Sequence, residues 1–269
     1  EHYLPKCTTS EAAWGELDLN EIDCAPIPLR VVTGDQSAVL FADGHPNLEG
    51  FSIQCGTGAF LQQFSKVELH PGSPLLESVL YQGEEVGNPL LRSIEGCVNG
   101  GGSAMEWWKT QNQLEWRNHI EDWCERYLDP PIFINGVGGL GSPFWMAKMR
   151  SRFLEPASVE AQAVGVLESI VFLIQCNIDA FKSAGLTQST IRISGGLSQS
   201  DAFCQKLANL SGCKINRAPE QESSARGLAY LLSQSPEWEW LPGQSFEPKR
   251  DRSLAKRYDS FCENMPRNE

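Results

Sequence analysis

The clearest pattern of apolar and polar positions runs from residue 158 to residue 185. Apolar residues recur there at intervals of three and four, which is the period of one buried helix face. Ser158 can cap the start of such a helix, and Gly185 suits the position just past its end. We therefore predict one long helix over 158–185, with apolar positions at Val159, Ala163, Val166, Ile170, Ile174 and Ile178.

Short β-branched runs alternate with helical patterns after this helix. They predict strands at 191–194 and 214–217, and helices at about 201–211 and 224–233. This β-α-β-α succession requires a parallel or mixed sheet covered by helices, so the predicted fold class is α/β, with a mixed sheet flanked by helices. Other predicted elements are strands at about 50–55, 58–63, 78–81 and 90–95, a helix at 105–123 and a surface helix after Pro236. Residues 1–29 show weak periodicity and predict a linking segment.

Three predicted strands run into turns that carry candidate chemistry. The strand at 190–194 ends in Gly195-Gly196, the strand at 51–55 in Gly56-Thr57-Gly58, and the strand at 29–33 in Gly34-Asp35-Gln36. Glycine lets the backbone turn where a side chain would clash, and the N–H groups of such turns can hold phosphate oxygens. Two glycine turns of this kind in one chain predict a nucleotide site, with ATP as the ligand.

Composition narrows the possible partners. The 269 residues are enough for one large or two small domains, and the net charge of −12 argues against nucleic acid or an anionic membrane as a partner.

Nine cysteines are irregularly spaced, and Cys55, Cys97, Cys176 and Cys204 lie in apolar patterns, which predicts buried reduced thiols. No Cys-x-x-Cys pair occurs and the four histidines are scattered, so no metal site is predicted. There is no signal peptide and no charge-free run long enough to cross a bilayer, which predicts a cytoplasmic protein.

Six motifs follow one another along the chain: Gly34-Asp35-Gln36, Gly56-Thr57-Gly58-Ala59-Phe60, Glu95-Gly96 through Gly100-Gly101-Gly102-Ser103-Ala104-Met105-Glu106-Trp107, Gly139-Leu140-Gly141-Ser142-Pro143-Phe144-Trp145, Ser194-Gly195-Gly196 and Glu222-Ser223-Ser224-Ala225-Arg226-Gly227-Leu228-Ala229-Tyr230-Leu231. In this order they resemble the carboxyl-terminal half of the FGGY carbohydrate kinases, in the glycerol kinase-like branch. The resemblance covers about residues 30–235.

The resemblance implies a two-lobed kinase in which each lobe has an actin-like, ribonuclease H-like core. Residues 1–47 would be the remnant of the N-terminal lobe, 48–235 the nucleotide-binding lobe, and 236–269 a tail packed on that lobe. Turn residues at 43–47 would mark the hinge. The missing N-terminal lobe would supply most contacts to the sugar or polyol substrate and most ligands of Mg²⁺, so the fragment alone would be inactive. A homo-oligomer is a further possibility.

The resemblance implies an acceptor site at the first motif. It makes Asp35 the catalytic base, which would orient the acceptor hydroxyl and take its proton. It places Gln36 beside the sugar and Phe60 against the acceptor. From the residues alone, Asp35 could instead be a plain helix N-cap.

The resemblance also implies a nucleotide site for ATP. Its residues are Gly56, Thr57, Gly58, Gly102, Glu106, Gly195, Gly196 and Ser200. Thr57 would offer its hydroxyl and N–H to the β and γ phosphates, and Gly196 would face the adenine. The family pattern has Gln at the position of Glu106, so this chain carries a negative charge there. Ser200 stands where glycerol kinases often carry Asn, and a hydroxyl makes one such hydrogen bond rather than two.

Other interpretations remain beside this one. The chain could be an inactive nucleotide-binding or interaction module derived from such a kinase. The segment Gly136–Gly141 matches a dinucleotide fingerprint, and an NAD-linked oxidoreductase would require that turn to lead into a helix, although Pro143 follows at once. Tryptophans at 107, 108, 116, 123, 238 and 240 are predicted to pack in the core or at an interface rather than to stack on sugars. Arg226 is predicted to pair with a carboxylate such as Glu222.

Overall fold

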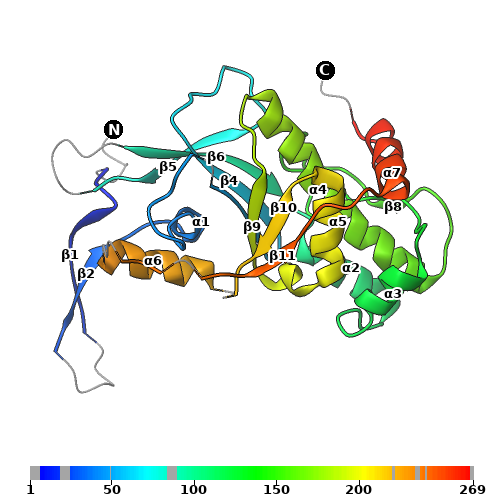
Figure 1. The fold of residues 1–269 in the computed structure, drawn as a ribbon, viewed down its shortest axis with the longest axis horizontal. Helices are drawn as coiled ribbons and strands as arrows, with labels where there is room; N and C mark the ends of the chain where they lie inside the picture. The colour runs from blue at the N-terminus through cyan, green and yellow to red at the C-terminus, as the bar shows by residue number, and fades with distance from the viewer. Residues whose placement is uncertain are drawn as a thin grey trace.

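The computed structural model describes residues 7–18, 25–48, 50–83, 90–219, 222–233, 237–239 and 241–266. Its centre is a seven-stranded mixed sheet with the strand order β11-β10-β9-β3-β4-β6-β5, seen nearly edge-on in Figure 1. The strands are β3 (Phe51–Cys55), β4 (Ala59–Ser65), β5 (Leu76–Tyr81), β6 (Leu91–Val98), β9 (Thr190–Ser194), β10 (Lys214–Arg217) and β11 (Gln244–Phe246). The α/β class and the mixed sheet are therefore confirmed.

The parallel part of the sheet consists of β10, β9 and β3, and the remaining neighbours pair antiparallel. The predicted strands are all present, with ends that differ by a few residues. The sequence pattern missed β11, because only three residues pair with β10 at the edge of the sheet. The tail therefore contributes a strand to the main sheet as well as a helix.

One face of the sheet packs on α4 (Val159–Ser183), the long helix predicted from the apolar pattern. Ser158 Oγ accepts a hydrogen bond from Ala161 N, and Gly185 has a φ of +81° just past the helix end, as predicted. The helix is long and apolar enough to cross a membrane, but 89% of its most apolar window is buried inside the fold. It is the core helix of this lobe.

Helices α2 (Gly102–Asn112), α3 (Ile120–Arg126) and α5 (Asp201–Ser211) lie beside α4 on the same side of the sheet (Figure 1). The single helix predicted over 105–123 is wrong, because the chain breaks at Gln113, where φ is +51°. The break lets Trp108 and Trp123 meet edge to face with ring centroids 5.9 Å apart. One short pair of strands also belongs to this structure: β7 (Phe133–Ile134) and β8 (Arg152–Phe153).

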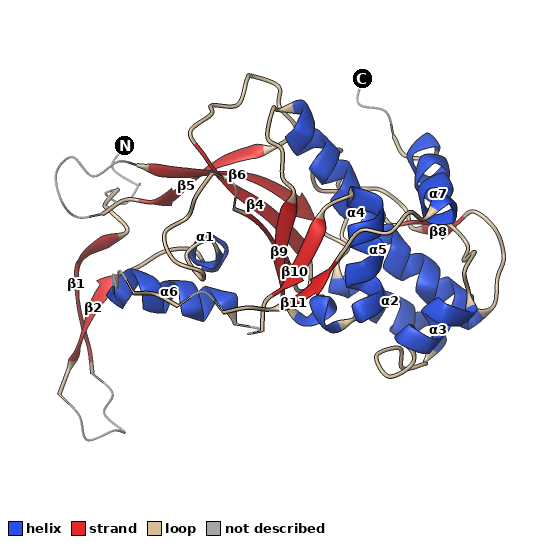
Figure 2. Ribbon diagram, in the orientation of Figure 1, coloured by secondary structure: helices blue, strands red, loops and turns tan. Residues whose placement is uncertain are grey.

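The opposite face of the sheet carries α1 (Asp35–Val39) and α6 (Ser223–Ser233), which lie on the other side in Figure 2. They pack so closely that a Cβ at Gly227 would lie 1.8 Å from Ala38 O. A small apolar cluster of Phe41, Phe64, Leu80 and Leu231 fills this interface. The described part of the predicted linking segment forms a hairpin of β1 (Glu11–Leu17) and β2 (Ile27–Val31), which the weak periodicity did not indicate.

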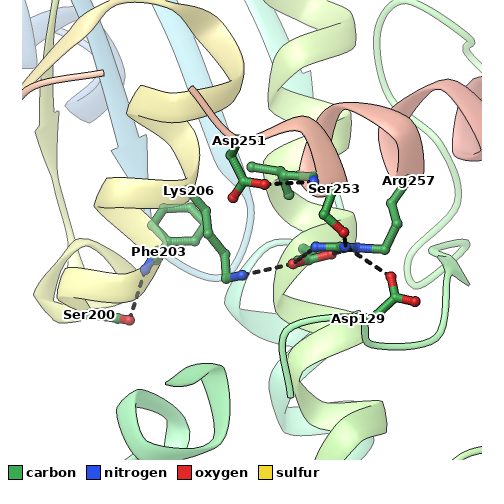
Figure 3. A network of polar contacts seen from close by, with 9 residues as sticks. Asp129, Ser200, Phe203, Lys206, Asp251, Ser253 and Arg257 are labelled. Carbon is green, nitrogen blue, oxygen red and sulfur yellow. Dashed lines mark hydrogen bonds and ion pairs between the residues drawn. The ribbon is translucent and has the colours of Figure 1, made fainter. Parts of the chain in front are cut away.

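The C-terminal helix α7 (Arg252–Glu263) packs against α4 and α5, and confirms the helix predicted in the tail. It is more than a surface helix, because Leu254 and Phe261 are completely buried. Arg257 enters a buried ionic network with Glu168 of α4 and Lys206 of α5 (Figure 3). The proposed boundaries at residues 47 and 235 remain predictions.

Candidate functional site

Two glycine turns lie side by side at one edge of the sheet. Because β3 and β9 are parallel neighbours, with Gln54 opposite Ser194, the turns that follow them leave the sheet at the same edge. These turns are Gly56-Thr57-Gly58 after β3 and Gly195-Gly196 after β9. The carboxyl ends of parallel strands are where open α/β sheets bind their ligands. We call the two turns, together with residues 100–102, the glycine cradle.

The backbone packing inside the cradle explains its glycines. A Cβ at Gly195, whose φ is +92°, would lie 2.5 Å from Cys55 O, and a Cβ at Gly102 would lie 2.6 Å from Gly56 O. Gly102 N donates to Gly56 O (2.9 Å), and Ser103 N donates to the Thr57 carbonyl oxygen (2.9 Å). The start of α2 is thereby fastened to the turn after β3. Side chains are excluded from these contacts.

The cradle is open on its outer side. A Cβ at Gly56 or Gly196 would meet no atom within 4 Å, and Thr57 is exposed between Gly56 and Gly58. Gly196 begins a 3-10 turn over Gly196–Gln199. Exposed backbone beside a tightly packed strand end can approach a phosphate or a planar base without interference from side chains.

A row of side chains crosses the sheet next to the cradle, on the face that α1 and α6 cover. Ser194, Gln54 and Phe60 occupy consecutive partner positions on β9, β3 and β4, so they share one face. Gln54 Nε2 donates to Ser224 Oγ of α6 (3.5 Å). Within the described residues, Ser194 Oγ and Gln54 Oε1 are buried without a hydrogen-bond partner. Buried polar atoms of this kind are uncommon and suit a ligand contact.

The predicted contact of Phe60 with the acceptor stays a prediction. Sequence reasoning missed Ser194 and Gln54 as candidates. Phe60 is 38% exposed, which is unusual for a phenylalanine on a central strand. The signal for Ser194 and Gln54 was their polarity in an otherwise apolar pair of strands. Their register across the sheet could not be known before the strand pairing.

Asp35 and Gln36 form the first turn of α1. Gly34 is the N-cap and makes no side-chain cap bond, so the alternative role of Asp35 as N-cap is wrong. The Asp35 carboxylate is exposed and accepts a hydrogen bond from Gln36 N (2.8 Å). Within the described residues, the buried amide oxygen Gln36 Oε1 has no hydrogen-bond partner. Helix α1, which they begin, covers the face of the sheet that carries the row from Ser194 to Phe60.

Ser200 is engaged by the protein itself. It is the N-cap of α5, where its Oγ accepts from Phe203 N (3.1 Å) and donates to Glu121 Oε1 (2.6 Å). The other Glu121 oxygen accepts from Ala202 N (2.9 Å). A hydroxyl has one proton to donate, so a contact of Ser200 with a base would have to replace Glu121. Sequence reasoning did not identify Glu121.

Glu106 lies on α2 with its charge compensated. Arg117 Nη2 lies 2.7 Å from Glu106 Oε1, and the Arg117 guanidinium lies over the ring of Trp116, 4.8 Å from its centroid. Trp116 Nε1 also donates to Glu106 Oε1 (3.4 Å). Hydrogen bonds from the Lys109 ammonium and from the backbone N–H of Arg117 hold the pKa of the neighbouring Glu115 at about 2. The negative charge of Glu106, where the family pattern has Gln, therefore has the Arg117 guanidinium beside it.

The glycine-rich loop Gly136–Gly141 supports the cradle and does not open a helix. Asn135 Nδ2 donates to Gly100 O (2.9 Å), and Ser142 Oγ accepts from Cys97 N (2.6 Å). The completely buried Asn177 of α4 accepts from Ser142 Oγ (2.6 Å). Turns and an isolated bridge follow Gly141, so the helix that an NAD-linked oxidoreductase requires at this turn is absent from 135–151.

Tryptophans 107, 108, 116 and 123 pack in the helical layer, as predicted, with Trp108, Trp116 and Trp123 buried. Trp240 lies outside the described residues, and Trp238 packs edge to face on Tyr230. The predicted ion pair between Arg226 and Glu222 is wrong. Arg226 Nε donates to Ala42 O (2.8 Å), and the guanidinium lies over the Trp238 ring at 4.9 Å. It ties α6 to the end of α1.

The predicted thiols are free. Cys55, Cys176 and Cys204 are buried, and Cys97 is half-buried. Burial raises the pKa of Cys204 to about 12, and it raises the pKa of Cys55 as well. The Cys55 and Cys204 thiols therefore stay protonated and unreactive at neutral pH.

The predicted hinge turn at residues 43–47 lines an open cavity of about 320 Å³. Arg192 forms an ion pair with Asp43 there, with 3.0 Å between Nε and Oδ2. Ser52 and Thr190, at the starts of β3 and β9, also line it. The cavity therefore lies at the strand edge opposite the glycine cradle.

The sheet, its two helical faces and the cradle define an α/β lobe of the actin-like ATPase fold. Solved structures with this architecture include glycerol kinase from Plasmodium falciparum with ADP (TM-score 0.78, 18% identity, 95% of this chain and 54% of that chain). A ligand-bound xylulose kinase from Lactobacillus acidophilus has a TM-score of 0.74 at 18% identity, over 88% of this chain and 51% of that chain. At this identity the likeness shows the fold alone.

The chain belongs to the FGGY family of carbohydrate kinases, because residues 51–234 match the family's C-terminal domain. Similar curated proteins include the glycerol kinase of Geobacter sp. strain M21, at 27% identity over 94% of this chain and 54% of that protein. The glycerol kinase of Trichodesmium erythraeum is 30% identical over 87% of this chain and 50% of that protein. The chain thus spans about half the length of these relatives.

Proposed function

We propose that this chain is the ATP-binding lobe of a carbohydrate kinase that transfers the γ-phosphoryl group to a sugar or polyol hydroxyl. The observation that carries the proposal is the glycine cradle, in which two turns leave neighbouring parallel strands at one edge and are fastened to the start of α2. Family membership supports the same function. The alternative of an inactive module has no observation in its favour.

The cradle fits an adenine nucleotide. Open space at Gly196 would admit the base, and the exposed Thr57 between its two glycines would contact the phosphates with its hydroxyl and N–H. The unpartnered Ser194 hydroxyl borders the same turn. Gly102 and Glu106 of α2 would lie along the nucleoside, with Arg117 neutralising Glu106. Ser200 would contribute less than the family pattern implies, since Glu121 holds it.

The acceptor side would be formed by α1. Asp35 would orient the acceptor hydroxyl and take its proton, while Gln36 and Phe60 would contact the sugar or polyol. ATP with Mg²⁺ supplies the phosphoryl group and the charge neutralisation that its transfer needs. Within the described residues, no group of three or more His, Cys, Asp and Glu side chains is placed to hold a metal. We propose that phosphates, water and ligands from another lobe hold Mg²⁺.

The assembly proposed from the family pattern has two lobes. Residues 1–47 would belong to the first lobe, 48–235 to the nucleotide-binding lobe and 236–269 to its tail, with a hinge at 43–47. A first lobe would complete the acceptor site and exclude water on closure. We propose a cytoplasmic location for the enzyme.

Calorimetric titration of this chain with ATP tests the proposal. We expect a dissociation constant between about 1 mM and tens of micromolar, and negligible sugar phosphorylation by this chain alone. Gly196→Arg should abolish ATP binding, because the side chain would fill the open space. Ser183→Arg, at the exposed end of α4, should bind as the parent chain does. Equal affinity for ATP and inorganic phosphate would refute the cradle assignment.

Asp35→Asn separates the acceptor site from the nucleotide site. The variant should bind ATP with unchanged affinity. In a two-lobed enzyme that carries this lobe, it should lower turnover by about a hundredfold to ten-thousandfold, because the amide cannot accept the hydroxyl proton. Full turnover together with a lower melting temperature would show that Asp35 only stabilises the start of α1.

A further inference from the structure

The side chain of Arg217 contacts the turn that forms one side of the glycine cradle. Arg217 is the last residue of β10, and it lies opposite Ile193 of the parallel neighbour β9. Its Nη1 donates to two consecutive carbonyl oxygens, Ser198 O (3.0 Å) and Gln199 O (3.1 Å). The strand register therefore brings a guanidinium group to the end of the 3-10 turn that Gly196 begins.

The same guanidinium group also contacts the start of α5 and the edge strand β11. Its Nη1 lies 2.8 Å from Asp201 Oδ1 in the first turn of α5, and its Nη2 donates to Gln244 Oε1 of β11. Gln244 Nε2 donates to the other carboxylate oxygen of Asp201 (3.3 Å). The Arg217 side chain is 14% exposed, and its guanidinium lies over the ring of Phe246, 5.4 Å from the centroid. One planar guanidinium thus connects the turn, α5 and β11.

The turn depends on contacts from its neighbours, because a 3-10 turn is held weakly by its own backbone. Ser198 N donates to Gly195 O at 3.1 Å, and 3-10 bonds of this kind have poorer geometry than α-helical ones. The buried side chain of Leu197 packs in the main core. The outer side has no such contact, since a Cβ at Gly196 would meet no atom within 4 Å. The position of Gly196 therefore depends on the contacts that Arg217 makes at the other end of the turn.

We propose that Arg217 is a positioning residue for the nucleoside part of the bound nucleotide, because it fixes the turn in the conformation that leaves Gly196 open. This inference rests on the proposed function, in which the base lies against Gly196. The turn after β3, which would contact the phosphates, is fastened differently, since Gly102 N and Ser103 N hold it from α2. Loss of Arg217 should therefore weaken binding of the nucleoside more than binding of the phosphates.

Arg217→Met tests this division of the cradle. Methionine keeps an unbranched apolar stem beside Phe246 and removes every N–H donor of the guanidinium. We expect the dissociation constant for ATP to rise about tenfold, because the turn must then be ordered when the base binds. The dissociation constant for inorganic triphosphate should change by less than about twofold. Phosphorus NMR titrations, carried out well below the melting temperature, measure both ligands at the weak affinities expected of a single lobe.

Arg192→Met is the matched control. Arg192 of β9 is also an arginine of the central sheet, its side chain is 16% exposed, and its Nε lies 3.0 Å from Asp43 Oδ2. This ion pair lies at the strand edge opposite the cradle. The control should therefore lose stability, as Arg217→Met does, but it should bind ATP within about twofold of the parent chain.

Two milder variants decide the question if Arg217→Met does not fold. Arg217→Lys keeps the positive charge, but its single ammonium group reaches fewer of the acceptors, so its ATP affinity should lie below that of the parent chain. Gln244→Ala removes a partner of Arg217 on the exposed edge strand and should weaken ATP binding about twofold to threefold. Full ATP affinity in both variants would contradict the role of Arg217.

Amide hydrogen exchange follows the turn itself, without any ligand. In Arg217→Met, the amide of Ser198 should exchange about tenfold faster than in Arg192→Met, while the amides of Gly102 and Ser103 keep their rates. Unchanged ATP affinity in Arg217→Met, or an equal loss of affinity in Arg192→Met, would overturn the inference. Failure of the parent chain to bind ATP would instead refute the proposed function, on which the inference rests.

Discussion

The ionic network under α7 gives a quantitative test of the fold. Glu168 of α4 is 1% exposed, and its carboxylate accepts two hydrogen bonds from Arg257 (2.7 Å each) and one from Lys206 (2.8 Å). Figure 3 shows Arg257 reaching from α7 and Lys206 from α5 toward the same carboxylate. Glu168→Gln keeps the size of the side chain and removes its charge.

The expected loss of stability in Glu168→Gln depends on the two buried cations that the variant leaves without a charged partner. The side chains of Arg257 and Lys206 are only 8% and 14% exposed, and removing one partner of a buried ion pair costs about 3–5 kcal/mol. The flexible Lys206 side chain can turn toward water, whereas Arg257 stays charged at all ordinary pH values. The cost therefore comes mainly from Arg257, and we expect the lower end of that range, about 3 kcal/mol.

Urea unfolding followed by circular dichroism measures this cost, with a fall in melting temperature of about 6 to 12 °C as the parallel observation. Asp129→Asn is the control, because Asp129 also binds Arg257 but its side chain is 86% exposed. That variant should lose less than about 1 kcal/mol. If Glu168→Gln costs no more than Asp129→Asn, the network does not stabilise the α4–α7 interface and the reasoning is wrong.

Two further predictions concern the cradle and its neighbouring thiol. Gly195→Ala should lower the free energy of unfolding by about 3 kcal/mol or more, because the strain of a φ of +92° and the clash with Cys55 O add together. The control is Gly185→Ala, whose Cβ would meet only open space and which should cost about 1 kcal/mol in the same urea assay. Equal costs for the two variants would show that the structure relieves the clash at Gly195. For Cys204, a pKa raised by burial from 9.0 to about 12 gives stability that is present below pH 9 and lost between pH 9 and about 12. Between pH 8 and pH 10 the parent chain should therefore lose about 1.4 kcal/mol more than Cys204→Ala, and an equal loss in both would contradict burial of this thiol.

The sequence predicted those parts of the fold that depend on local patterns. The helix from Val159 to Ser183 carries its own cap, period and terminal glycine, and the alternation around β9 and β10 is equally local. The glycine turns after β3 and β9 were also predicted, because paired glycines after a strand are typical of a tight turn. Their role in binding a nucleotide remains a proposal. The family resemblance supplied roles for Asp35 and Thr57, which remain proposals.

The features that sequence reasoning missed depend on tertiary contacts. The break at Gln113 turns the chain so that Trp123 packs on Trp108, and no local signal in 105–123 outweighs the helical pattern. Glu121 lies 79 residues from Ser200 in the chain, so the hydrogen bond between them could not be predicted from the sequence. The strand β11 is too short for alternation to be detected, and its pairing with β10 decides its conformation.

Helix α4 contacts both α7 and the loop that packs on the glycine cradle, but it does so through residues at different points along its length. Glu168 binds α7 in the first half of the helix, whereas Asn177, in the second half, holds Ser142 of the loop that packs on Cys97 and Gly100. A buried helix of 25 residues packed at native density moves as a unit. Loss of charge at Glu168 should therefore lower global stability without changing the shape of the cradle, since the glycine contacts that define it do not involve α7. ATP affinity of Glu168→Gln, measured well below its melting temperature, should equal that of the parent chain, and a weaker affinity would show that α7 and the cradle are coupled through α4.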